Sequence, residues 1–160
     1  MLPHEKAMVE RLKAEPFALL GINSDGDRDV SKKLSEEEKN AIKGLGAPEG
    51  QSIDAIRRGD EKVIEKLGAA GPALKKKVFD IDLANLQSIL EKQNVTWRQA
   101  VLGTTRGALP AKWNVQGWPT IYILDHKGVI RFKDKHGKAL DKAIDTLLDE
   151  MAAETRKSKE

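Results

Sequence analysis

The sequence predicts an α/β protein in which helices cover a layer of strands. Residues 17–23, FALLGIN, form an uninterrupted apolar run that is typical of a strand buried on both faces of a parallel sheet. Residues 120–125, TIYILD, and 129–132, VIRF, flank the turn DHKG and predict an antiparallel hairpin. Residues 138–154 then carry apolar side chains at helical spacing. Strands that alternate with helices favour a layered architecture.

Length and composition limit the possible classes of protein. The 160 residues suffice for one domain, or for one domain with a sizeable insertion. The net charge is only +3, and no arginine-rich run is interleaved with aromatic residues, so we expect no nucleic-acid partner. No apolar stretch approaches the roughly 18 residues of a membrane helix, so we expect no membrane segment. The sequence contains no cysteine, which excludes disulfides and thiol nucleophiles within it.

The N-terminal residues 2–15 predict a helix. Pro3 suits the first helical turn, and Met8 and Leu12 belong to an apolar stripe between charged residues. A helix directly before the apolar run 17–23 extends the alternation of helices and strands.

From residue 30 to residue 93 the sequence favours helices and contains no convincing strand. Ser35 and Glu38 form the pattern of a capping box, in which each side chain bonds the other residue's backbone N–H. We expect four or five short helices here. The further helix starts are predicted at Asp60, Pro72 and Asp82.

The possible metal ligands do not share a spacing that would bring them together. His4, His126 and His136 lie in a first helical turn, a hairpin turn and a loop, so we expect no metal site and no cofactor. The motif SDGDRD lacks the later glutamate of a calcium loop, and we expect Asp25 or Asp27 to cap the next helix instead.

The last third of the chain supplies the remaining strands. Residues 95–101, VTWRQAV, predict a strand, and residues 107–115 predict a loop with one helical turn. Residues 156–160 are expected to be a frayed tail.

This order of elements, with GWPT directly before the hairpin, resembles that of a thioredoxin-like domain. The resemblance is closest to bacterial redoxins of the TlpA-like thiol–disulfide oxidoreductase type. The matching segments are LPHEKAMVERL, FALLGINSDGDRD, NVTWRQ and WNVQGWPTIYILDHKGVIRFK. The resemblance implies a three-layer α/β/α fold that lacks its first strand here and carries an all-α insertion.

The resemblance also implies domain boundaries. Residues 1–33 and 89–155 would form the thioredoxin-like domain, and residues 34–88 a helical insertion that weakly resembles a HEAT repeat. A single helical repeat cannot bury its own apolar face. The insertion would therefore pack on the other domain, pair with another chain or stay partly molten. It is either a structural elaboration or a docking surface for a partner protein.

The segment Gly-Trp-Pro-Thr is the candidate site. In the family the proline before the first hairpin strand is cis, so the resemblance implies a cis bond before Pro119 and a substrate-contact loop formed by Trp118, Pro119 and Thr120. Backbone groups near Thr120 would pair with an extended substrate segment. The alternative interpretation is that Trp118 and Pro119 merely begin an edge strand.

The family's chemistry requires a Trp-Cys-x-x-Cys turn, which relatives carry shortly before the segment that matches MLPHEK. This sequence has no cysteine. Either the chain is truncated, which we prefer, or its lineage has lost the motif. The resemblance implies thiol–disulfide exchange with protein thiols or disulfides outside the cytoplasm, in a full-length form, and no exchange by this chain. The alternative is a non-catalytic module that binds proteins through the cis-proline groove, the insertion or both.

Overall fold

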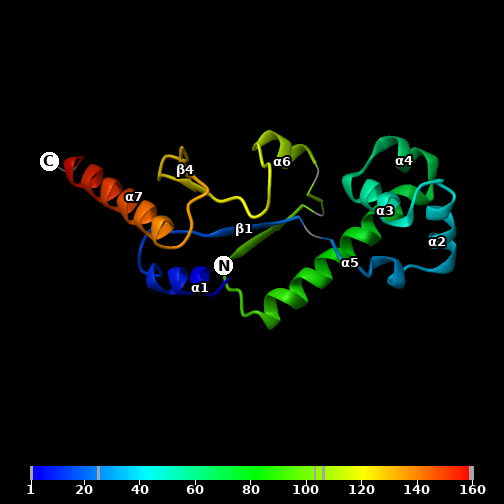
Figure 1. Cartoon of the computed structure of the whole chain (residues 1–160), viewed down its shortest axis with the longest axis horizontal. Coiled ribbons are helices and arrows are strands. Elements are labelled where there is room, and N and C mark those ends of the chain that lie inside the picture. The colour runs from blue at the N-terminus through cyan, green and yellow to red at the C-terminus, as the bar shows by residue number, and fades with distance from the viewer. Residues whose placement is uncertain (1, 25, 103, 106, 159–160) are drawn as a thin grey trace. The chain divides into compact units, whose positions relative to one another are not determined.

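The structure is a computed structural model that describes residues 2–24, 26–102, 104–105 and 107–158 (Figure 1). It contains helices and strands, so the protein is of mixed α/β class, as the sequence predicts. The chain divides into two compact units, which we describe separately. We call Met1–Leu19 with Trp113–Glu160 the hairpin unit, and Leu20–Lys112 the helical unit.

The described residues of the hairpin unit form two helices and one pair of antiparallel strands. Tyr122 pairs with Lys133 and Ile123 with Phe132, and the register is irregular after Ile123. The predicted turn 125–128 is present, since the Gly128 N–H donates to the Asp125 carbonyl at 2.9 Å. The elements are α1 (Leu2–Arg11), β3 (Tyr122–Leu124), β4 (Ile130–Lys133) and α7 (Lys138–Lys157).

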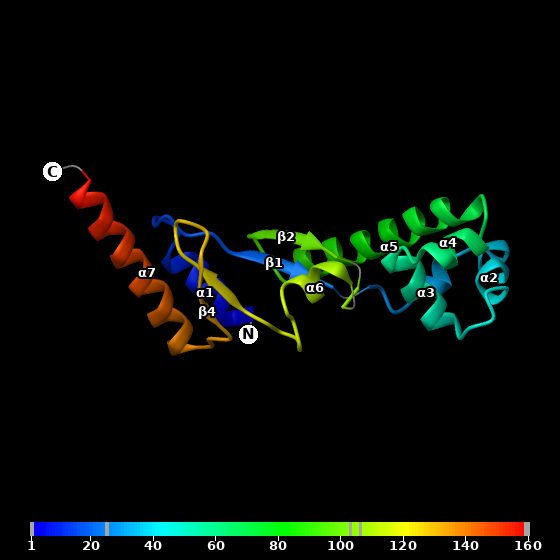
Figure 2. The same cartoon turned by 90° about the horizontal axis from the view of Figure 1, so that it is seen from above.

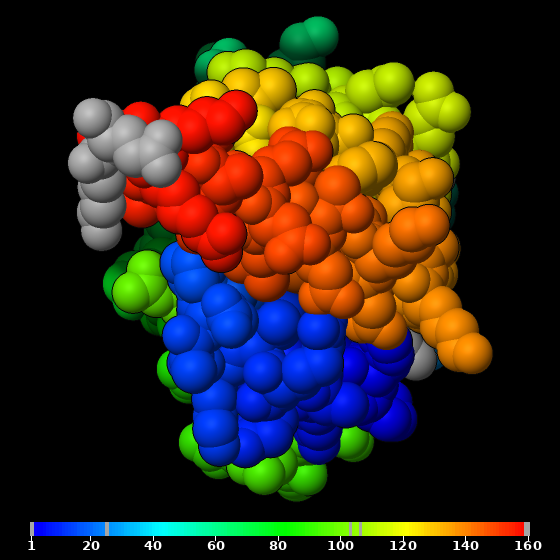
Figure 3. All heavy atoms as spheres, turned by 90° about the vertical axis from the view of Figure 1, so that its left-hand side faces the viewer, coloured from blue at the N-terminus to red at the C-terminus, as the bar shows by residue number. Residues whose placement is uncertain are grey.

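One apolar core holds the hairpin unit together. Met8 and Leu12 of α1 are buried in the same cluster as Ile123 of β3. The space-filling view shows α1 lying alongside α7 (Figure 3). The stripe on α7 is the one that the sequence predicts, and α7 continues to Lys157, so residues 156 and 157 of the expected frayed tail are helical. The buried residues of α7 are Leu140, Ala143, Ile144 and Leu147.

The helical unit contains most of the helices and one pair of parallel strands. Leu20 of β1 pairs with Arg98 of β2, and Asn23 pairs with Val101 (Figure 2). The elements are β1 (Leu20–Asn23), the 3₁₀ helix η1 (Val30–Lys33), α2 (Glu36–Lys43), α3 (Glu49–Arg58), α4 (Glu61–Lys66), α5 (Ala70–Lys92), β2 (Arg98–Val101) and α6 (Ala108–Lys112).

Local signals set the ends of several of these helices. The capping box before α2 is confirmed, because the Glu38 N–H donates to the Ser35 hydroxyl and the Ser35 N–H donates to the Glu38 carboxylate. Asp60 caps α4 by accepting from two backbone N–H groups, as predicted. Gly59, with φ of 68°, ends α3 in the left-handed conformation that favours glycine.

The helices of this unit bury their own apolar core. η1, α2, α3 and α5 surround one cluster, so side chains that lie far apart in the sequence cover one another. The buried members are Val30, Leu34, Ile42, Ile53, Ile56, Leu74 and Val78. The cluster thus includes Val30, which lies outside the predicted insertion 34–88, so the expectation that the insertion needs a further surface to cover its apolar face stays a prediction.

The prediction of a helix start at Asp82 was wrong. α5 runs without a break from Ala70 to Lys92, and Asp82 lies in its middle. Pro72 does lie in the first turn of α5, where backbone N–H groups have no intrahelical acceptor and a missing donor costs little.

The strands form two sheets rather than the single layer that the sequence predicts. Among the described residues, β1 pairs with β2 and β3 pairs with β4, and no hydrogen-bond ladder joins the pairs. β1 is not buried on both faces, because Leu20 and Ile22 are 56% and 39% exposed. β1 and β2 belong to the same compact unit as the helices α2 to α6. The predicted insertion boundaries 34–88 stay a prediction.

Candidate functional site

The predicted contact loop lies directly before β3 in the hairpin unit. The Trp118–Pro119 bond is cis, as predicted. The Trp118 side chain is 44% exposed, Pro119 is exposed and Thr120 is partly buried. The three candidate residues therefore present an indole and a short stretch of backbone at the surface.

Hydrogen bonds hold this loop at both of its sides. The Thr120 hydroxyl donates to the Gly117 carbonyl at 2.6 Å, which closes the turn around the cis bond. The Asp134 N–H donates to the Ile121 carbonyl at 2.8 Å, and the Ile121 N–H donates to the Asp134 carboxylate at 3.4 Å. The loop is thus an ordered extension of the hairpin.

The residues before the loop are fixed to the hairpin strands by contacts that the sequence analysis missed. The Trp113 and Tyr122 rings meet edge to face with centroids 5.3 Å apart, and the Tyr122 hydroxyl donates to the Trp113 carbonyl. The Lys133 ammonium lies 5.1 Å from the centre of the Tyr122 ring and donates to the Asn114 carbonyl at 3.1 Å. An edge-to-face pair and a cation on an aromatic ring each add stabilisation beyond simple burial.

The chemistry available at this loop is that of binding. Among the described residues, no acceptor or donor engages the backbone N–H or carbonyl of Thr120, so both can pair with an added extended segment. The exposed Trp118 indole offers apolar area beside them. Trp118, Pro119 and Thr120 carry no group that ionises near neutral pH, and the sequence has no thiol.

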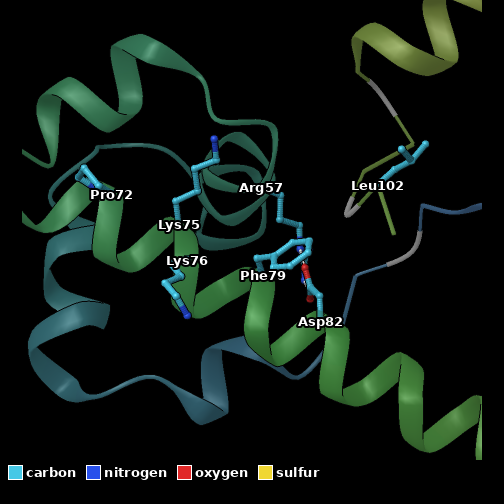
Figure 4. Close-up of a pocket in the computed structure, with 7 residues that line it drawn as sticks. All are labelled: Arg57, Pro72, Lys75, Lys76, Phe79, Asp82 and Leu102. Atoms are coloured by element: carbon cyan, nitrogen blue, oxygen red, sulfur yellow. Dashed lines mark hydrogen bonds and ion pairs between the residues drawn. The ribbon is translucent and has the colours of Figure 1, made fainter. Parts of the chain in front are cut away.

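A second polar cluster lies in the helical unit. Asp82 of α5 is 2% exposed and accepts from Arg57 of α3 at its Nε (2.9 Å) and Nη2 (3.0 Å) (Figure 4). Arg57 also donates to Asp54 at 3.0 Å and to the Asp27 carbonyl at 2.7 Å. Burial alone would lower the pKa of Arg57, but the bonds to Asp82 and Asp54 raise it above its usual value.

The cluster ties the segment after β1 to the helices. The Asp27 N–H donates to Asp82 at 2.7 Å, and the Asp27 carboxylate accepts from the Asp29 N–H at 2.8 Å and the Lys33 ammonium at 2.6 Å. The prediction that Asp27 caps the next helix was wrong, because the N-cap of η1 is Asp29 and the Asp27 carboxylate instead anchors the segment after β1. Asp25, the other predicted cap, lies outside the described residues. A Cβ at position 26 would lie 2.2 Å from the Arg57 guanidinium, so a larger residue than Gly26 would force that side chain to shift.

The sequence held one signal for this cluster. Leu74, Val78 and Asp82 are spaced by four residues, so Asp82 falls on the buried stripe of α5. A carboxylate on a buried stripe requires a cationic partner. The identity of that partner, Arg57, depends on the packing of α3 against α5 and is not readable from spacing.

Acid is expected to destabilise the helical unit through Asp27. Burial would raise the pKa of Asp27, but the bonds from Lys33 and from the Asp29 N–H hold it below its ordinary value of 3.8. The unfolded state therefore binds a proton at Asp27 more readily than the folded state does. The stabilisation by the ionised Asp27 carboxylate is complete above about pH 4 and is lost as the pH falls through the lower, folded-state pKa. Urea unfolding between pH 2 and 6 should show a flatter acid limb in Asp27→Asn and in Lys33→Gln. An unchanged slope in Asp27→Asn would refute this role.

Comparisons with known proteins place the chain in no family. No family model matches it, and neither a curated protein nor a solved structure matches it. None of the described helices combines the length and apolar character needed to cross a membrane. The described residues also bring no three histidine, aspartate or glutamate side chains together in a way that could hold a metal ion.

Proposed function

We propose that the chain is a thioredoxin-like domain of the TlpA-like thiol–disulfide oxidoreductase type that binds extended segments of other proteins. In this proposal Trp118, Pro119 and Thr120 contact the bound segment. The order of elements supports it: a helix, a strand, a parallel partner strand, the Gly-Trp-Pro-Thr loop, a hairpin and a final helix.

The observation that carries the proposal is the exposure of Trp118 beside the unpaired backbone of Thr120. An extended segment that pairs with Thr120 gains main-chain hydrogen bonds, and its side chains gain apolar contact with the indole. Because the loop is already ordered by Thr120 and Asp134, little conformational entropy is lost on binding.

Thiol exchange is a separate requirement that these 160 residues do not meet. Exchange proceeds through attack of a thiolate on a disulfide sulfur, and the sequence contains no cysteine. In the first form of the proposal, a Cys-x-x-Cys segment encoded upstream supplies the thiols and the partners are protein thiols or disulfides outside the cytoplasm. In the second form, which is the alternative, the chain is a non-catalytic protein-binding module.

The coding sequence upstream of the first codon separates the two forms. An in-frame Trp-Cys-x-x-Cys supports the oxidoreductase, and a stop codon or an unrelated sequence supports the binding module.

Binding itself is tested with an unstructured decapeptide that carries one central cysteine between apolar residues, and with its serine analogue. We expect Trp118→Ala to weaken peptide binding by about tenfold in calorimetry, because a buried tryptophan contact is worth more than 1 kcal/mol. The matched control is Val129→Ala, which removes an apolar side chain that is 54% exposed in the same unit. Equal affinities of the Trp118→Ala and Val129→Ala variants would refute the site, as would unshifted Trp118 and Thr120 resonances on titration.

A further inference from the structure

A pocket of about 260 Å³ lies in the helical unit. This volume is below the roughly 300–1,000 Å³ that accommodate drug-sized ligands, so only a small molecule fits. Most of its lining comes from one face of α5, with Arg57 and Leu102 contributed by other segments (Figure 4). The lining residues are Arg57, Pro72, Lys75, Lys76, Phe79, Asp82 and Leu102.

The apolar part of the lining is aromatic. Phe79 lines the pocket and is 45% exposed. Its ring lies next to the Arg57–Asp82 pair (Figure 4). Leu102 and Pro72 supply further apolar surface. An exposed ring beside aliphatic side chains favours a flat apolar ligand, because offset stacking adds to area burial.

The buried ion pair contributes little net charge to the pocket. Asp82 neutralises Arg57, whose Nε, Nη1 and Nη2 atoms already donate to Asp82, Asp54 and the Asp27 carbonyl. The Arg57–Asp82 pair therefore forms a polar part of the lining whose hydrogen-bonding groups already have partners within the protein. A ligand with several negative charges would find no second set of strong donors there.

Lys75 is the cation that the pocket leaves without an acidic partner. Among the described residues, no carboxylate lies within ion-pair distance of the Lys75 ammonium, whereas Lys76 pairs with Asp80 at 2.6 Å. The Lys75 ammonium lies against Gly59, where a Cβ would be 2.5 Å from it. This position is at the C-terminal end of α3, whose partial negative charge favours a cation. Figure 4 shows the Lys75 and Lys76 side chains pointing in different directions.

We propose that this pocket binds a small aromatic monocarboxylate. The ring lies against Phe79 and Leu102, and the carboxylate accepts hydrogen bonds from Lys75. One available cation matches one negative charge, and one exposed ring with two aliphatic neighbours matches one ring of the ligand. The lining residues include none of the contact-loop residues, and the proposal does not depend on the function proposed for that loop.

Three probes separate the charge from the ring. Benzoate carries both, benzamide keeps the ring without the charge, and acetate keeps the charge without the ring. In NMR titrations of the whole chain at low ionic strength, we expect benzoate to shift the Phe79 and Lys75 amide resonances saturably. Benzamide and acetate should each bind at least about fivefold more weakly. Equal affinities for benzoate and benzamide would overturn the proposal, and so would an absence of saturable binding.

Variants on the same helix assign the contacts. Lys75→Gln and Phe79→Ala should each weaken benzoate binding by about fivefold. The matched controls are Lys76→Gln, which changes a cation that already has a partner, and Ile89→Ala, which removes an apolar side chain that is 47% exposed. These controls should change the affinity less than twofold. If Phe79→Ala disturbs the fold, Phe79→Leu keeps apolar volume without the ring and should still lose affinity. Unchanged binding in Lys75→Gln refutes the assignment.

Discussion

Replacing Asp82 with alanine is expected to lower the free energy of unfolding of the helical unit by about 3–5 kcal/mol, because one partner of a buried ion pair is removed. The Asp82 side chain is 1% exposed and the Arg57 side chain 11% exposed, so water cannot replace the lost bonds. The substitution removes the acceptor of the Arg57 Nε–H and of the Asp27 N–H. Urea denaturation followed by circular dichroism measures the loss.

The matched control is a substitution of Asp54, the second carboxylate that bonds Arg57. Asp54 bonds the same guanidinium at 3.0 Å, but its side chain is 57% exposed. Asp54→Ala should therefore cost no more than about 1 kcal/mol. Asp82→Asn, which keeps an oxygen for the Asp27 N–H, should fall between the two alanine variants. Equal losses in Asp82→Ala and Asp54→Ala would show that burial does not decide the strength of this pair.

The sequence predicted those features that depend on neighbouring residues. Ser35 with Glu38, and Asp60 with the N–H groups that follow it, are local arrangements, and the structure contains both. The stripe on α7 and the turn at Gly128 follow from spacing and turn chemistry in the same way.

Features that depend on distant packing were mispredicted or missed. Asp82 was assigned to a helix start because aspartate favours that position, but its bonds reach Arg57 and Asp27, which are 25 and 55 residues away. At the contact loop, the cis bond before Pro119 agrees with what the resemblance implies, whereas the contact role of its residues stays a prediction. The anchors Asp134 and Tyr122 did not follow from the sequence, since their role depends on how the hairpin folds back.

Replacing Ile56 with alanine is expected to destabilise the helical unit by about 2–5 kcal/mol through lost burial and a residual cavity. The Ile56 side chain is fully buried in the cluster that runs from Val30 to Val78. Hydrogen exchange read by mass spectrometry should show faster exchange in α3 and α5. The control is Ile89→Ala, whose side chain is 47% exposed and should cost less than about 1 kcal/mol.

The same experiment tests whether the two units unfold separately. The core around Ile56 shares no residue with the core of α1, Ile123 and α7, so exchange in α7 should be unchanged in Ile56→Ala. In Ile56→Ala, peptide binding at Trp118 should persist, because the contact loop is anchored within the hairpin unit. Benzoate binding at the pocket beside Phe79 should become weaker. If α7 and α3 both lost protection from hydrogen exchange, separate unfolding would be contradicted. The contact loop and the pocket would then belong to one cooperative folding unit.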